Sequence, residues 1–290
     1  MISVYGEGLV DLVPTDHSPL APLQPALGGG PFNAAISAAR LGSSVQFHSR
    51  LSTDHFGQQL ANALTDEGVN LDYLERGPEP TTLAVTSIDD TGSATYSFYV
   101  EGTADRLHSP VLAEPRVAAF GTLSLALPPA ADRYVEAAKE LAAQGCIVAL
   151  DPNIRPLSDT AEHRARLAGM LQHVSILKLS EEELEFFSDI SLDVPVVVTT
   201  RGEDGLVIAV GGNRIEIPGV PTTVKDTIGA GDTIFGAICA QLDQAEATPG
   251  NLLEQGWERI GRYAVTAAAI TCSRTGAQPP SADEVEGMLS

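Results

Sequence analysis

The sequence predicts an α/β fold in which a mostly parallel sheet is covered by helices on both faces. Strand-like apolar segments alternate with segments of helical apolar spacing through most of the chain, as in repeated β-α units. The 290 residues, 43% of them hydrophobic, are enough for one large domain with a substantial core. One alternating hairpin, at about residues 81–100, interrupts this pattern and predicts a small β appendage.

Composition restricts the classes of function. The net charge of −21 disfavours nucleic acids and anionic membranes as partners. An anionic ligand would therefore need local positive sources, namely helix N-termini, a bound cation, and basic residues such as Lys178, Arg201 and Lys225. No apolar stretch approaches the ~18 residues of a membrane span, and the first residues lack a signal-peptide pattern, so we expect a cytoplasmic protein.

The chain opens with a predicted strand at residues 2–13, which a glycine interrupts, and continues in a polar, proline-marked segment at 14–25. Gly6 and Gly8 match the start of a dinucleotide-binding fingerprint, but Asp11 stands where its third glycine belongs. The sequence therefore argues against a Rossmann cofactor site.

Three consecutive glycines at 28–30 run into a helix predicted at 31–42, which has Pro in its first turn and Gly just past its end. Bare glycine backbone can lie directly against a polyol. The Asn33 amide can both donate and accept hydrogen bonds, which suits vicinal hydroxyls. A strand at 45–50 and a helix at 54–67 follow.

Neither His48 nor His55 has a second metal-type residue at i+3 or i+4, and we expect both at the surface. The hairpin then follows, with an acidic, glycine-containing turn at 89–92. The second half of the chain is predicted to alternate strands at 117–123, 146–150, 175–179 and 194–199 with helices at 130–144, 161–173, from 181, and 252–270. Ligands of such sheets collect at the carboxyl ends of the strands. Trp257, in the last of these helices, is expected to pack rather than to stack on a base.

Residues 226–232 read DTIGAGD and lead into apolar residues of helical spacing at 233–238. The first N–H groups of a helix have no partner within it, and glycines let a phosphate approach the backbone. Asp232 beside such a turn could take the proton of a hydroxyl that attacks a γ-phosphate. Asp is also a favoured N-cap and Gly is common in loops, so the short motif alone would more often be structural.

The motif has a counterpart. DTIGAGD resembles the DTxGAGD signature of the ribokinase-like (PfkB-type) carbohydrate kinases, and GGGPFN at 28–33 resembles the glycine-rich sugar-binding signature of that family. Matches run from about Gly6 to Gln278. The resemblance implies a ribokinase-like three-layer α/β/α fold with a mostly parallel central sheet, formed by one domain at 1–290. It also implies a small β-sheet lid at about 12–27 and 80–105, which in this family covers the sugar and often makes a homodimer contact.

The resemblance further implies site residues. Asp232 would be the base, and Gly229, Ala230 and Gly231 would offer N–H groups to the transferring phosphoryl. The implied sugar ligands are Asp11, Gly29, Asn33, Asp105 and Arg155, the last from the DxNxR-like segment at 151–155. For Asp11 and Arg155 the simpler alternatives are a solvated strand-end carboxylate and a loop ion pair.

ATP, Mg²⁺ and a candidate K⁺ are the implied cofactors. The implied nucleotide-binding residues are Lys178, Thr200, Gly202, Gly205, Thr227, Gly229 and Gly231. Glu183 corresponds to a family glutamate that organises water around Mg²⁺, although Ser180 to Glu183 also has the spacing of a helix capping box. Asp226 and the Ile228 carbonyl resemble a monovalent-cation site, which backbone near Gly276 would complete.

The implied activity is ATP-dependent phosphorylation of a primary hydroxyl of a small sugar. Gly30 stands where ribokinases usually carry Lys, which indicates the fructokinase and 2-keto-3-deoxygluconate kinase branch. Val100 replaces an Arg that is common there, which disfavours an acidic acceptor, so fructose is preferred over 2-keto-3-deoxygluconate, nucleosides and other sugars. The alternative of another class is a non-catalytic sugar-binding or regulatory protein with the kinase fold. No GxxxxGK[ST] pattern occurs, which excludes a P-loop kinase.

Overall fold

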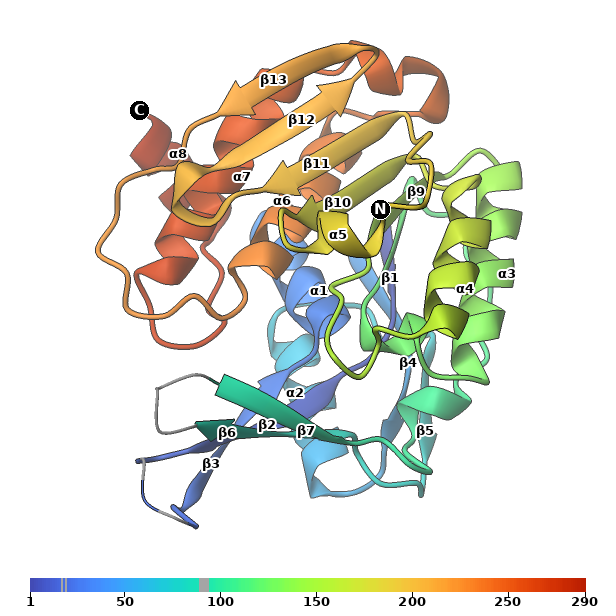
Figure 1. The fold of residues 1–290 in the computed structure, drawn as a ribbon, viewed down its shortest axis with the longest axis vertical. Coiled ribbons are helices and arrows are strands. Elements are labelled where there is room, and N and C mark those ends of the chain that lie inside the picture. Colours follow the sequence, from blue (N-terminus) through green and yellow to red (C-terminus); the bar gives the residue numbers. More distant parts are fainter. Residues whose placement is uncertain (17, 19, 89–93) are drawn as a thin grey trace.

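The computed structural model describes residues 1–16, 18, 20–88 and 94–290, whose strands form two separate sheets (Figure 1). Within these residues the large sheet has the order β13-β12-β11-β10-β9-β8-β1-β4-β5. All neighbouring pairs from β5 to β11 are parallel, and β12 and β13 are added antiparallel. Its strands are β1 (Ile2–Tyr5), β4 (Val45–Ser52), β5 (Leu74–Gly77), β8 (Val117–Gly121), β9 (Ile147–Asp151), β10 (Ile176–Ser180), β11 (Val196–Thr200), β12 (Leu206–Val210) and β13 (Asn213–Ile217). The mostly parallel sheet is confirmed.

Helices cover both faces of this sheet and make three layers (Figure 1). One face carries α1 (Gly30–Arg40), α2 (His55–Asp66), α6 (Ala230–Gln244), α7 (Trp257–Cys272) and α8 (Ala282–Leu289). The other carries α3 (Ala130–Ala143), α4 (Ala161–Leu171) and α5 (Glu183–Phe186). Side chains of one strand alternate between the two cores, so Val4 belongs to the first and Tyr5 to the second. The predicted three-layer fold is confirmed.

The second sheet has the order β3-β2-β6-β7 and lies at the lower left of Figure 1. Its strands are β2 (Leu9–Pro14), β3 (Leu23–Gly28), β6 (Leu83–Ile88) and β7 (Ala94–Tyr99). β6 and β7 form the predicted hairpin, whose predicted turn at 89–92 lies outside the described residues. Short 3-10 helices occur at Asp105–Leu107 (η1), Leu123–Leu125 (η2), Gly202–Asp204 (η3) and Pro249–Glu254 (η4).

Three local predictions were wrong. The strand predicted at 2–13 is two strands in different sheets, because the chain turns at Gly6 (φ 152°), where a Cβ would lie 2.2 Å from the Pro31 ring. The helix predicted at 252–270 is η4 followed by α7, since Gln255 is extended. His48 is fully buried, with its ring 4.2 Å from that of Tyr5, because the strands of a sheet covered on both faces have little solvent-facing surface.

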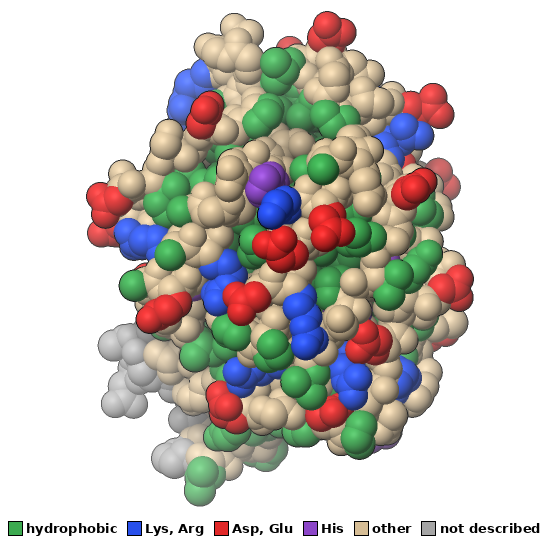
Figure 2. All heavy atoms as spheres, turned by 90° about the vertical axis from the view of Figure 1, so that its right-hand side faces the viewer, with side chains coloured by type: hydrophobic (Ala, Val, Ile, Leu, Met, Phe, Trp, Pro, Cys, Tyr) green, Lys and Arg blue, Asp and Glu red, His purple; other side chains and the backbone are tan. Residues whose placement is uncertain are grey.

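The described helices and the charges on one face of the protein bear on its possible membrane and nucleic-acid partners. Among the described residues, no helix combines the length and apolar character needed to cross a bilayer. On the face that carries α3 and α4, basic and acidic side chains are interspersed (Figure 2). This face therefore offers no continuous basic stripe for a nucleic-acid backbone.

Candidate active site

The sugar signature and the DTIGAGD motif meet because α1 and α6 lie side by side and run in the same direction. At their N-terminal ends the Asn33 amide donates to Asp232 Oδ2 at 2.8 Å, and at their C-terminal ends the Gln244 amide donates to the Leu41 carbonyl at 2.8 Å. Gly236 permits this approach, since a Cβ there would lie 2.7 Å from a backbone oxygen of α1. Both helices therefore direct their positive N-terminal ends to one place.

The turn before α6 depends on glycine and on Asp226. Gly229 has a left-handed backbone (φ 77°), and a Cβ there would lie 2.6 Å from the Ala277 Cβ. Asp226 accepts the N–H of Ile228 at 3.0 Å and of Gly276 at 2.8 Å, which holds two loops together. The first i to i−4 bond of α6 is the 2.8 Å bond from the N–H at residue 233 to the carbonyl of Gly229. The amides at 231 and 232 precede that ladder and can face an anion.

Asp232 is 9% exposed. Burial raises its pKa, and the hydrogen bond from Asn33 and the positive charges of Lys178 and Arg155 act in the opposite direction. A carboxylate with a raised pKa, fixed by an amide beside a helix N-terminus, suits general-base chemistry on a hydroxyl.

Asp11, on β2, lies at the same glycine segment. Its Oδ2 is 2.3 Å from where a Cβ on Gly28 would stand, and Asp232 Oδ1 is 3.3 Å from where a Cβ on Gly30 would stand. Burial, followed by repulsion from Asp232, raises the pKa of Asp11 to about 6. Gly29 between them has φ 107° and starts α1. Two carboxylates thus flank bare backbone, an arrangement that can bind several hydroxyls of one polyol.

Lys178 and Asp151 form a buried ion pair on the neighbouring strands β10 and β9, with Nζ 2.9 and 3.1 Å from the two carboxylate oxygens. Burial alone would lower the pKa of Lys178, but Asp151 raises it above its ordinary value. The Lys178 Nζ is 2.9 Å from where a Cβ on Gly231 would stand. A cation therefore lies at the first turn of α6, where phosphate oxygens would bind.

Glu183 is held by three backbone contacts. One oxygen accepts the Ser180 N–H at 2.7 Å and the other the Ile154 N–H at 2.7 Å, while the Glu183 N–H donates to Ser180 Oγ at 3.3 Å. Ser180 and Glu183 thus make the reciprocal hydrogen bonds of a capping box, but α5 has Glu182 as its N-cap and no side-chain cap bond, so the pair does not cap this helix. Arg155, the residue after Ile154, is exposed, and its charge acts on Asp232.

The remaining predicted nucleotide-binding residues lie at the end of β11, around the η3 turn and before α6. Thr200 ends β11 and donates to the Leu179 carbonyl at 3.3 Å. Gly202 and Gly205 flank the η3 turn with φ of 56° and 92°. Thr227 is exposed just before the α6 turn. Their contacts with a nucleotide stay predictions.

The sequence profile of the pfkB family carbohydrate kinases matches residues 1–284. The chain belongs to this family. It is similar to a fructokinase of Rhizobium leguminosarum bv. trifolii, with 33% identity over 261 residues that cover 83% of this chain and 79% of the relative. It is therefore a carbohydrate kinase, an ATP-dependent phosphotransferase that acts on sugars.

Two of the solved structures that share its fold are fructokinases. A Xylella fastidiosa fructokinase with bound ATP has a TM-score of 0.88 and 24% identity, over 99% of this chain and 97% of that one. A Vibrio cholerae O395 fructokinase with fructose, ADP and calcium ion has a TM-score of 0.86 and 24% identity, over 100% and 98% of the two chains.

Asp105 is placed differently from the other predicted sugar ligands of this kinase. It begins η1, is 3% exposed, and accepts a 2.6 Å hydrogen bond from Thr82 Oγ1 at the start of the small sheet. Burial raises its pKa. Its observed contacts join two segments of the fold, and its sugar contact stays a prediction.

One feature of the kinase site was missed from the sequence. Glu7 is 1% exposed, and its carboxylate accepts hydrogen bonds from the turn after β8. The only sequence signal was an acidic residue between two glycines in an apolar run.

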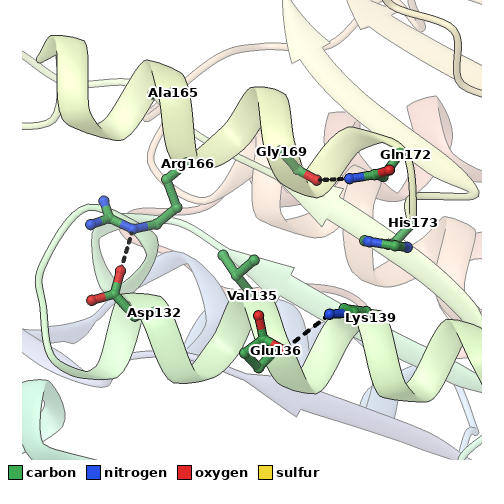
Figure 3. Close-up of a pocket in the computed structure, with 9 residues that line it drawn as sticks. All are labelled: Asp132, Val135, Glu136, Lys139, Ala165, Arg166, Gly169, Gln172 and His173. Atoms are coloured by element: carbon green, nitrogen blue, oxygen red, sulfur yellow. Dashed lines mark hydrogen bonds and ion pairs between the residues drawn. The ribbon is translucent and has the colours of Figure 1, made fainter.

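A hollow of about 330 Å³ lies elsewhere, between α3 and α4 on the outer side of their layer (Figure 3). Its two longest basic side chains are paired, Arg166 with Asp132 at 2.9 Å and Lys139 with Glu136 at 3.5 Å. It is distinct from the phosphotransfer site, since no residue of α1 or α6 lines it.

Proposed function

We propose that this kinase is a fructokinase, which transfers the γ-phosphoryl group of ATP to a primary hydroxyl of fructose. The observation that carries the proposal is the 2.8 Å hydrogen bond between Asn33 and Asp232, which joins the sugar signature to the phosphate-binding turn. The name of the Rhizobium relative supports the choice of sugar.

In the proposed mechanism the sugar lies on the glycine segment, where Asp11 and Asn33 bind its hydroxyls. Asp232 takes the proton as the primary hydroxyl oxygen forms its bond to the γ-phosphorus, and the bond from that phosphorus to the bridging oxygen breaks to release ADP. The backbone N–H groups at 231 and 232 and the Lys178 ammonium stabilise the phosphoryl charge as it moves. The Ala230 N–H, which was also predicted to face the phosphoryl, donates to the Thr227 carbonyl at 3.3 Å instead.

Mg²⁺ and K⁺ are proposed at two carboxylates. Both Glu183 oxygens accept backbone N–H groups, and each keeps a second lone pair for water around Mg²⁺. Each Asp226 oxygen likewise accepts one backbone N–H group, and the remaining lone pairs beside the Ile228 carbonyl suit a hard monovalent cation. Mg²⁺, when bound, neutralises ATP phosphate charge. Chelation by EDTA should abolish turnover and Mg²⁺ should restore it, and KCl should give a higher rate than NaCl at equal ionic strength.

The surroundings of Val100 favour a neutral acceptor. Val100 is buried in an apolar cluster with Leu9, Ala84 and Leu123. The nearby Arg106 guanidinium is engaged by the carbonyls of Val100 and Pro128. A carboxylate at the far end of a sugar acid would therefore lack a free cation here, and we expect 2-keto-3-deoxygluconate to be a poorer acceptor than fructose.

The small sheet is proposed as the lid of a single domain at 1–290. β2 carries Asp11, so the sheet holds one sugar ligand directly. Covering the sugar would exclude water from the transferred phosphoryl and suppress ATP hydrolysis. Leu23 and Tyr99, on its outer strands, are 43% and 62% exposed, and the strand register places both on the face opposite Asp11. We propose that this face forms a homodimer contact. Because ATP is its phosphate donor, the kinase is proposed to act in the cytoplasm.

A coupled ADP-release assay across a panel of neutral sugars, sugar acids and nucleosides tests the proposal. Fructose should give the highest kcat/KM. ADP formation with another acceptor but not with fructose would contradict the proposed substrate. Sugar binding without ADP formation from any member of the panel would instead support a non-catalytic binding protein.

A further inference from the structure

Glu7 lies in the loop between β1 and β2, beneath the glycine segment. One carboxylate oxygen accepts hydrogen bonds from Thr122 Oγ1 and from the Leu123 N–H at 3.3 Å. The other accepts from the Ser124 N–H at 2.9 Å and from Ser124 Oγ. Four donors converge on this one buried carboxylate and fix the turn that follows β8.

The fixed turn touches the start of α1. A Cβ on Gly30 would lie 2.5 Å from Thr122 Cγ2, and the same Cβ would lie 3.3 Å from Asp232 Oδ1. The Glu7 carbonyl oxygen is 2.9 Å from where a Cβ on Gly29 would stand. Glu7 therefore supports the glycine segment both through its own backbone and through Thr122.

We propose that Glu7 is a positioning residue of the phosphotransfer site, which holds the 122–124 turn against the start of α1 and sets the electrostatic surroundings of Asp232. The inference rests on the proposed function, because it assumes that Asp232 is the base and that the glycine segment binds the sugar. A residue with a purely structural role would affect folding alone. A positioning residue would affect sugar affinity and the pH profile.

The charged and polar groups that act on Asp232 come from several elements. The groups that lower the pKa of Asp232 are Asn33 on α1, Lys178 on β10 and Arg155 after β9, whereas the negative charge of Glu7 raises it. The charge of Asp232 in turn raises the pKa values of Asp11 and Asp151. Removing the negative charge of Glu7 should therefore lower the pKa of Asp232. The acidic limb of kcat should move to lower pH, because the base then stays ionised in more acidic solution.

The test compares Glu7→Gln, Glu7→Asp, Ser124→Ala and the control Asp243→Asn in the full-length protein. Asp243 is a charged residue on the same helix as Asp232, and eleven residues place it about 16 Å along the axis. For each variant, kcat and KM are measured against pH with the best sugar of the panel. The sugar dissociation constant is measured by calorimetry, and folding is checked by circular dichroism.

We expect Glu7→Gln to raise the sugar KM and dissociation constant by on the order of tenfold and to shift the acidic limb to lower pH. Glu7→Asp and Ser124→Ala disturb the hydrogen bonds to the 122–124 turn, so they should weaken sugar binding. Because both variants keep the negative charge at residue 7, the acidic limb of kcat should stay in place. Asp243→Asn should change neither quantity. These results together support the inference.

Wild-type affinity and an unmoved acidic limb in folded Glu7→Gln would overturn the inference, as would an equal shift in Asp243→Asn. If Glu7→Gln does not fold, unchanged sugar affinity in both Glu7→Asp and Ser124→Ala would overturn it. If the wild-type protein binds sugar without turnover, the proposed function fails on its own, and the dissociation constants still decide the role of Glu7.

Discussion

Replacing Asp11 by Asn should stabilise the fold at neutral pH while it weakens sugar binding. Burial and the neighbouring Asp232 raise the pKa of Asp11 from 3.8 to about 6 in the folded protein. No such environment exists in the unfolded chain. Between these two pKa values the folded state binds more protons than the unfolded state, so stability falls as the pH rises from about 4 to about 6. Asn carries no charge, so the variant does not lose this stability as the pH rises.

The magnitude follows from the size of the pKa shift. A change from 3.8 to about 6 is about two pKa units, and each unit corresponds to about 1.4 kcal/mol, which gives an upper limit of about 3 kcal/mol. Asp11 is partly exposed, so solvent screening reduces the expected gain to roughly 1–2 kcal/mol. The gain should be complete above about pH 6 and absent below about pH 4.

Urea unfolding of the ligand-free protein at about pH 7.5 and about pH 4.5 measures this gain, and sugar titrations measure the affinity. Asp189→Asn is the control, because Asp189 is 87% exposed and should change the free energy of unfolding by less than about 0.5 kcal/mol. A variant at Asp11 that is no more stable than wild type at the higher pH, or equally stabilised at both, would refute the electrostatic reasoning.

Two further substitutions probe the phosphate side of the site. Lys178→Met should leave Asp151 buried and unpaired, lower the free energy of unfolding by about 3–5 kcal/mol and abolish turnover. Adding Asp151→Asn should recover the stability but not the activity. A recovered kcat in the double variant would contradict the phosphate-binding role of Lys178. Gly229→Ala should lower kcat by on the order of 100-fold, because its Cβ would lie 2.6 Å from that of Ala277 and displace the turn. Gly68→Ala, at a similar φ of 74° with open space around it, should match its backbone strain and keep full kcat; equal activity of the two variants would argue against the turn's role.

Much of the fold and part of the site could be predicted from local patterns. The alternation of strands and helices follows from apolar spacing, and the meeting of residues 33 and 232 follows from two motifs at helix N-termini on the same edge of the sheet. The pairing of Lys178 with Asp151 could not be predicted, since it depends on which strands are neighbours. Likewise, Glu7 has partners 115 to 117 residues away in the sequence, and no local pattern marks them.

The opening strand shows a different limit. Apolar residues resume after the glycine interruption at 6–8, so the pattern was compatible with one interrupted strand and did not show that residues 2–5 and 9–14 belong to two sheets. The separation depends on the contact of Gly6 with Pro31, which only the packed structure defines. It matters for function, because it places Asp11 on the small sheet rather than on the large one.

The central claim is that Asp232 deprotonates the attacking hydroxyl, and the most direct measurement is the turnover of Asp232→Asn with ATP and fructose. The substitution keeps the shape of the side chain and removes the base. We predict a loss of kcat on the order of 10³-fold or more, with ATP and fructose dissociation constants within a few-fold of wild type. Turnover close to that of wild type would contradict the account.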